Sequence, residues 1–163
     1  MPQVRADGVA LYVYRRLPGG SGVEFLQLRR SASTGEYQGS WQTVYGGVEG
    51  NETAVQAAMR ELREETGLSP VKMWQVEYLE SFYFRPHDYV LVMPVFAVEV
   101  AADAFVRLNH EHDDHRWVPD VHVGSHFMWR TQLEAIAILL NALRYGSAAI
   151  EFLTIKLGSE PAA

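Results

Sequence analysis

Short runs of alternating apolar and polar positions predict several strands in the first 45 residues. Val9, Leu11 and Val13 alternate with smaller or polar neighbours, and a period of two is typical of a strand. A glycine-rich turn at 18–22 follows, so this strand and the next predict a β-hairpin. The strands predicted here are 9–13, 23–30 and 41–45, with a polar connection at 31–39 and a glycine pair at 46–47 ending the last strand.

The rest of the pattern combines two helices with further strands. Thr53 and Gln56 have the spacing of a capping box, and Gly67 is typical of the position after a helix, which predicts a helix over 53–66. A second helix is predicted over 130–145, with an apolar stripe of Leu133, Ile136, Ala137, Leu140 and Leu143. The other predicted elements are strands at 71–84, 89–100 and 116–118, a turn at 85–88 and a charged loop at 110–115. Helices interleaved with such strands predict an α/β sandwich.

Length and composition narrow the class of protein. The 163 residues predict a single domain over 1–157 and a flexible tail over 158–163. The absence of cysteine excludes disulfides and thiolate metal ligands. Without a signal sequence or a long apolar run, we expect a soluble, cytoplasmic protein that does not bind membranes. The net charge of −6 argues against a polymeric nucleic acid as partner, but a metal ion could still present a small phosphorylated substrate to an acidic protein.

Acidic residues crowd the end of the first predicted helix. At about 100° per residue, Glu61, Glu64 and Glu65 share one face, and Ala54 and Ala57 would leave room above them. Like charges at this spacing cost about 0.2–0.5 kcal/mol per pair and lie beside the negative end of the helix dipole. A bound cation would offset this repulsion and would give the acidic residues a function as its ligands.

Two interpretations of this helix follow from its residues. A solvated helix with ion pairs such as Arg60 to Glu64 would need no ligand. Alternatively, the carboxylates and a freed backbone carbonyl in the Gly46-Gly47 turn would suit Mg²⁺, or Mn²⁺, which prefer oxygen ligands.

A longer motif favours the metal. The spacing reads G-x5-E-x7-R-E-U-x-E-E-x-G-U over residues 46–68, with U apolar, and is filled by Gly46, Glu52, Arg60, Glu61, Leu62, Glu64, Glu65, Gly67 and Leu68. In this the chain resembles the Nudix hydrolases. The resemblance implies the Nudix fold, an α/β/α sandwich with a mixed β-sheet, and metal-dependent hydrolysis of nucleoside diphosphates linked to another group.

The resemblance also implies roles for individual residues. Glu61, Glu64 and Glu65 would bind metal together with the Gly46 carbonyl, and Glu52 would pair with Arg60 to fix the loop against the helix. The remaining candidate is Glu111, which would bind metal or, like Glu64, act as the general base.

Further similarity points to a subgroup. Residues 41–49 and 56–61, and Glu111-His112 followed by Arg116-Trp117, resemble the subgroup that contains dihydroneopterin triphosphate pyrophosphohydrolase and proteins described as dATP pyrophosphohydrolases. Asn51 and Tyr45 depart from the family's usual residues, and Tyr45 lies where substrate would approach the glycine turn.

Other residues are candidates of lower specificity. Arg29 or Arg30 could contact phosphate, or form a surface ion pair. Trp41 could stack on a base or pterin ring, as could residues 127–129, although packing would explain each of them as well. The histidines of residues 110–115 would suit zinc, but such a run is more often a solvated loop.

The sequence therefore predicts a Mg²⁺-dependent pyrophosphohydrolase that converts a nucleoside or pterin triphosphate to a monophosphate and pyrophosphate. One alternative is a hydrolase of ADP-ribose or dinucleoside polyphosphates. Another is a Nudix-like module that binds a nucleotide without cleaving it. A homodimer is compatible with the sequence.

Overall fold

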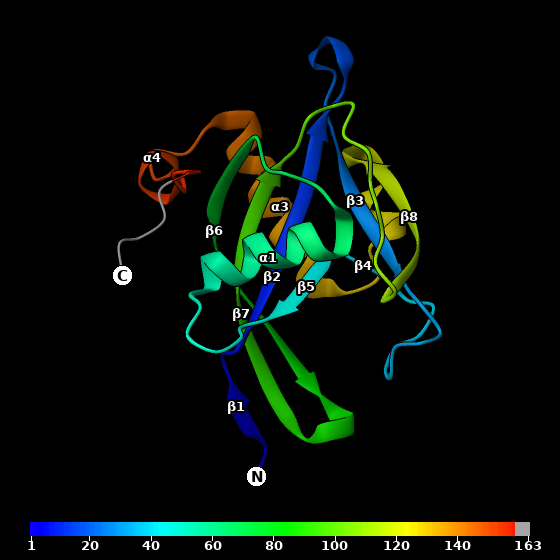
Figure 1. Ribbon diagram of the computed structural model, residues 1–163. Helices are drawn as coiled ribbons and strands as arrows, with labels where there is room; N and C mark the ends of the chain where they lie inside the picture. The colour runs from blue at the N-terminus through cyan, green and yellow to red at the C-terminus, as the bar shows by residue number, and fades with distance from the viewer. Residues whose placement is uncertain (159–163) are drawn as a thin grey trace.

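An eight-stranded mixed sheet forms the centre of the computed structural model, which describes residues 1–158 (Figure 1). The strands are β1 (Gln3–Arg5), β2 (Gly8–Arg16), β3 (Val23–Arg30), β4 (Trp41–Gln42), β5 (Val44–Gly47), β6 (Lys72–Phe84), β7 (Tyr89–Glu99) and β8 (His112–Pro119). The helices are α1 (Ala54–Thr66), α2 (Val123–His126), α3 (Arg130–Tyr145) and α4 (Ile150–Leu153), and short 3-10 turns are formed by Pro18–Gly20, Arg85–His87 and Asp120–His122. No helix among these residues is long and apolar enough to cross a membrane.

Strand β2 organises the sheet. It pairs parallel with β7 and antiparallel with β3 and β5. The predicted hairpin of β2 and β3 is confirmed, with Tyr14 opposite Phe25. β7 also pairs with β6 over most of their length, and this hairpin extends away from the rest of the sheet beside β1 (Figure 1). The sheet is therefore mixed, as predicted.

Helices cover both faces of the sheet. Val9, Leu11 and Val13 pack with α1, and the alternate residues Ala10, Tyr12 and Tyr14 belong to the core beneath α3. Figure 1 shows α1 in front of the sheet and α3 behind it. The α/β/α sandwich is confirmed, as is the first predicted strand. This strand, β2, is buried on both faces because it is a central strand between two helical layers.

The helix that carries the acidic residues is bounded as predicted. The Thr53 hydroxyl accepts the Gln56 N–H at 3.2 Å, and the Gln56 side chain accepts the Thr53 N–H at 2.8 Å. Gly67 follows the last turn with a left-handed φ of 67°. Both ends of α1 are thus fixed by local contacts, which sets the positions of the side chains between them.

Three predictions about local structure need correction. Residues 112–115 are not a loop but the first half of β8, because they pair with the end of β3. Ala137 is exposed, and the buried stripe of α3 runs through Ala135, Ile136, Leu139 and Leu140. Ala57 is fully buried in the core, so its small side chain does not provide the open space that was expected above the carboxylates. Of the predicted tail at 158–163, residues 159–163 lie outside the described residues.

Candidate active site

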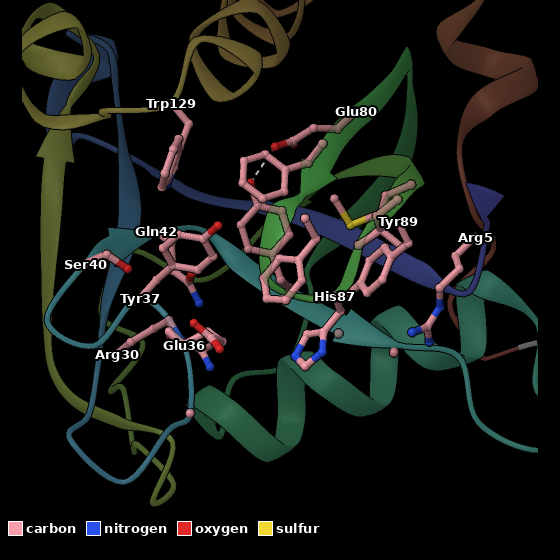
Figure 2. Close-up of a pocket in the computed structure, with 18 of the residues that line it drawn as sticks. Arg5, Arg30, Glu36, Tyr37, Ser40, Gln42, Glu80, His87, Tyr89 and Trp129 are labelled. Carbon is pink, nitrogen blue, oxygen red and sulfur yellow. Dashed lines mark hydrogen bonds between the residues drawn. The ribbon is translucent and has the colours of Figure 1, made fainter. Parts of the chain in front are cut away.

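A cavity of about 840 Å³ brings together residues from the sheet, from α1 and α3, and from the segments that connect these elements (Figure 2). One part is acidic, with Glu61 and Glu65 from α1 and Glu111 from the segment before β8. Another part is aromatic, and its residues come mainly from the β6–β7 hairpin, with Tyr37 and Trp129 from loops. The cavity can therefore accommodate a ligand with one charged and one flat apolar portion.

The acidic part depends on a close approach between β5 and α1. A Cβ atom on Gly46 would lie 2.0 Å from Cγ of Glu61, so the missing side chain at Gly46 is what admits the glutamate. The neighbouring Gly47 N–H donates to Glu61 Oε1 at 3.2 Å. Burial raises the pKa of Glu61, while the Arg60 guanidinium opposes that shift.

Glu65 is the most deeply buried of the three helix acids. It is 2% exposed, and its Oε2 has no hydrogen-bond partner among residues 1–158. Burial raises its pKa well above the usual value, and the charges of Glu61 and Glu111 add to the effect. An unpartnered buried carboxylate oxygen surrounded by other acids is costly unless a ligand satisfies it.

The imidazole of His112 lies beside Glu65. Its Nδ1 is 3.8 Å from Glu65 Oε2, and neither ring nitrogen has a hydrogen-bond partner within the described part of the chain. Burial lowers the pKa of His112 to about 4, so the ring is neutral at physiological pH. It therefore provides no positive charge to compensate Glu65.

Arg60 organises the turn that precedes α1. Its guanidinium donates two hydrogen bonds to Glu52, at 2.7 and 3.2 Å, and one to the Gly47 carbonyl at 2.7 Å. It also donates to Glu61 at 2.9 Å and to Glu64 at 3.1 Å. The predicted pairing of Glu52 with Arg60 is thus present, and these contacts raise the pKa of Arg60.

The three predicted metal-binding carboxylates do not share one environment. Glu61 and Glu65 are buried and line the cavity, whereas the Glu64 side chain is 55% exposed and is not a lining residue. Among residues 1–158, no three His, Asp or Glu side chains converge closely enough to hold a metal ion. Zinc was the less favoured interpretation of residues 110–115, and no such group of ligands converges there within the described part of the chain. The residues from 112 onward belong to a strand whose side chains alternate between faces.

The donor set nevertheless fits a hard divalent cation. Glu65 has an unpartnered buried oxygen, Glu61 occupies the space left by the missing Gly46 side chain, and Glu111 is close enough to raise the pKa of Glu65. Carboxylate oxygens that repel one another in this way are the ligands preferred by Mg²⁺ and Mn²⁺. Movement of the Glu64 side chain away from Arg60 would complete the set.

The candidate substrate residues separate into two groups. Arg30 lines the cavity and donates to the Glu36 carbonyl at 2.9 Å. Arg29 instead donates to Asp113 at 2.7 Å, outside the cavity lining. Trp41 is also not a lining residue, since its ring lies 4.0 Å beneath the guanidinium of Arg116.

Sequence reasoning missed most of the aromatic part. Phe82, Phe84 and Tyr37 line the cavity, and the Trp129 ring lies 5.5 Å from that of Phe82 and 5.7 Å from that of Tyr37. The usable signal was the period of two along β6, which places Glu80, Phe82 and Phe84 on one face.

Glu80 was also missed, and it is a buried acid at the border of the cavity. It is 2% exposed, and its two oxygens accept hydrogen bonds from the hydroxyl groups of Tyr12, Tyr45 and Thr131. Burial raises its pKa, while the three hydroxyl donors oppose that shift. Tyr45, which departs from the usual residue of the motif, is therefore a partner of Glu80 and is itself held by Gln132 at 3.0 Å.

Comparisons with known proteins identify a family and several relatives. The NUDIX domain model matches residues 5–132. An octanoyltransferase from Myxococcus xanthus is 36% identical over 119 residues, which are 72% of this chain but only 31% of that protein. A bis(5'-nucleosyl)-tetraphosphatase (asymmetrical) from Sus scrofa is 29% identical over 119 residues, covering 71% of this chain and 78% of that enzyme.

Solved structures show the same fold. A C. elegans Ap4A hydrolase, determined as a binary complex, superposes with a TM-score of 0.70 at 21% identity and covers 85% of this chain and 98% of that one. At this identity the similarity establishes the architecture, and the chemistry has to be argued from the residues in the cavity.

Proposed function

We propose, from the premise that this chain belongs to the Nudix hydrolase family, that it cleaves a phosphoanhydride bond in a nucleoside triphosphate and releases a monophosphate and pyrophosphate. The observation that carries the proposal is the meeting of Glu61 and Glu65 with Gly46 in a cavity that also has an aromatic part. A pterin triphosphate would satisfy the same requirements.

The acidic part of the cavity is the proposed metal site. Glu61, Glu65, Glu111 and the Gly46 carbonyl would hold Mg²⁺, or Mn²⁺, with Glu64 as a further ligand after it leaves Arg60. Once bound, such an ion supplies positive charge to a diphosphate and lowers the pKa of a coordinated water. This removes the repulsion that the metal-free carboxylates impose on an anionic substrate.

The chain's own residues would then position the reactants and move the proton. Glu111 lines the cavity, and its Oε1 accepts a long hydrogen bond of 3.5 Å from the Asn109 side chain, so a small reorientation would let it accept a proton from water. Glu64 is the alternative base. Arg30 would contact phosphate from the cavity wall, and Arg60 with Glu52 would keep Glu61 and the glycine turn in place.

A second candidate function is the hydrolysis of dinucleoside polyphosphates. It is favoured by the similarity to the Sus scrofa tetraphosphatase, which extends over most of both chains. ADP-ribose is a third substrate with the same linkage. A module that binds nucleotide without cleaving it is less favoured, because Glu61, Glu64 and Glu65 are all present and two of them line the cavity.

The test is a product analysis of the full chain with Mg²⁺ or Mn²⁺. A panel of nucleoside triphosphates, diadenosine tetraphosphate and ADP-ribose separates the candidates, since triphosphates yield pyrophosphate and the other two yield phosphate-bearing fragments. We expect metal-dependent release of pyrophosphate that Glu65→Gln reduces by at least about 10²-fold, as removal of a catalytic group commonly does. Glu77→Gln on the exposed side of β6 is the control. Absence of turnover with every substrate and both metals, from folded protein, would contradict the proposal.

A further inference from the structure

We propose that the aromatic part of the cavity is a nucleobase subsite in which Glu80 accepts a hydrogen bond from an amino group of the base. The inference rests on the proposed function only for the identity of the ligand as a nucleotide. It adds a feature by which the site would select among bases.

The acceptor capacity of Glu80 supports the inference. Its Oε1 accepts from Tyr45 and from Thr131, the latter at 3.1 Å, whereas Oε2 accepts from a single donor among residues 1–158, the Tyr12 hydroxyl at 2.8 Å. A carboxylate oxygen accepts about two hydrogen bonds, so Oε2 retains one acceptor position. All three hydroxyl donors point at the carboxylate and hold it as an acceptor at the border of the cavity.

The surrounding rings suit a flat ligand. Trp129 meets Tyr37 and Phe82 nearly edge to face, at interplanar angles of 80° and 77°, and all three are only partly buried. Figure 2 shows Trp129, Tyr37 and Glu80 around one space. Stacking of a heterocycle on partly exposed aromatic rings in a cavity is more favourable in free energy than contact of the same rings with water.

The charge of Glu80 decides which end of a nucleotide lies beside it. A buried carboxylate repels phosphate, so the phosphates belong with Arg30 and the proposed metal site. A base that presents an N–H donor gains a charge-assisted hydrogen bond, while one that presents only acceptors leaves Glu80 without that partner.

Neutral nucleosides test this without metal or hydrolysis. The full-length protein is titrated at about pH 8 with two pairs that differ by one amino group: guanosine against inosine, and adenosine against purine riboside. Quenching of tryptophan fluorescence reports binding beside Trp129, and calorimetry confirms the affinity. We expect the amino-bearing nucleoside of at least one pair to bind about tenfold more tightly, which is the effect of a hydrogen bond to a charged group.

Variants assign the effect to Glu80. Glu80→Gln should bring the affinity ratio of that pair to within about twofold, and Glu80→Asp, which withdraws the carboxylate by one methylene, should reduce it as well. Glu134→Gln is the matched control, because Glu134 also accepts from a tyrosine, Tyr78 at 2.7 Å, but does not line the cavity. Near-ultraviolet circular dichroism verifies that each variant is folded.

The outcomes separate this inference from the proposed function. No detectable nucleoside binding, equal affinity within both pairs, or an unchanged ratio in both Glu80 variants overturns the inference even if the protein hydrolyses triphosphates. A ratio that depends on Glu80 in a protein without hydrolytic activity supports the subsite and contradicts only the proposed reaction.

Discussion

Gly46 and Glu61 are packed so closely that a Cβ atom on the glycine would lie 2.0 Å from Cγ of the glutamate. The two residues belong to different elements, β5 and α1, which the core holds at a fixed separation. This contact therefore couples the glycine turn to the acidic part of the cavity. A side chain at position 46 can therefore be accommodated only if Glu61 moves.

Substitution of Gly46 by alanine is expected to displace Glu61 and to destabilise the protein. Overpacking at a buried contact commonly costs about 1–3 kcal/mol, and loss of the proposed metal ligand should lower activity by about 10²-fold or more. Urea unfolding and metal-dependent hydrolysis measure the two effects.

Gly47→Ala provides the control for this experiment. A Cβ atom at Gly47 would meet only the Asp7 carbonyl, at 3.9 Å, which is ordinary contact. We expect its stability and activity to stay close to those of the unsubstituted protein. Equal losses at both positions would show that any side chain in this turn is harmful and that the contact with Glu61 is not the cause.

Arg60→Lys is expected to lower activity by about 10- to 100-fold while metal binding persists. Lysine keeps the charge but cannot donate at once to Glu52, the Gly47 carbonyl and Glu61, as the guanidinium does. Hydrolysis assays combined with Mn²⁺ titration separate the two properties. Arg63→Lys, on the exposed side of the same helix, is the control. If metal affinity fell as steeply as activity, the positioning role of Arg60 would have to be abandoned.

The features that could be predicted from the sequence are mainly contacts between residues that are close together in it. The capping box at Thr53, the glycine at 67 and the pairing of Glu52 with Arg60 all involve residues fewer than fifteen positions apart, and the structure contains each of them. Contacts within one helix or one turn depend on the spacing of the residues in the sequence, so they can be predicted from it.

The aromatic part of the cavity could not be predicted because it is assembled over long distances in sequence. Trp129 reaches Tyr37 across 92 positions (129 − 37), and residues 112–115 form a strand only because β3 is beside them. A charged run without a partner strand is typical of a loop, so the pattern alone favoured the wrong assignment. Glu80 was missed for the same reason, since its role depends on Tyr12 and Thr131.

Replacement of Trp129 by leucine is expected to weaken nucleotide binding, whereas the same change at Trp41 is not. Trp129 lines the cavity, but the Trp41 ring lies against Arg116 outside it. Loss of one stacking partner is worth about 1–3 kcal/mol per base, which corresponds to a rise in KM of roughly 5- to 150-fold. Steady-state kinetics on the best substrate of the panel measures this rise. A larger effect at Trp41 would instead support the role that the sequence alone suggested for it.

Stability should depend on pH in opposite senses at two tyrosine-paired glutamates. Burial raises the pKa of Glu80 in the folded protein above its unfolded value of about 4.5. The folded state therefore binds the proton more tightly, and the contribution of this carboxyl to stability is greatest below pH 4.5 and is lost as the pH rises through the folded pKa. Glu80→Gln removes that loss. The stability of the variant relative to the unsubstituted protein should thus increase as the pH rises above about 4.5 towards the raised folded pKa, by at most about 1.4 kcal/mol per pH unit.

Glu134 provides the opposite case. Its hydrogen bond from Tyr78, with the ion pair to Arg130, lowers its folded pKa, so its contribution is present above the unfolded pKa and is lost as the pH falls. Glu134→Gln should therefore cost stability at neutral pH and progressively less in acid. The unsubstituted protein and both variants are unfolded with urea, without metal, at a series of pH values above and below the unfolded pKa of glutamate. The stability of each variant relative to the unsubstituted protein, plotted against pH, gives the two slopes. Slopes of the same sign would mean that burial does not control Glu80, and the carboxyl would then be available to a ligand at lower pH than its environment implies.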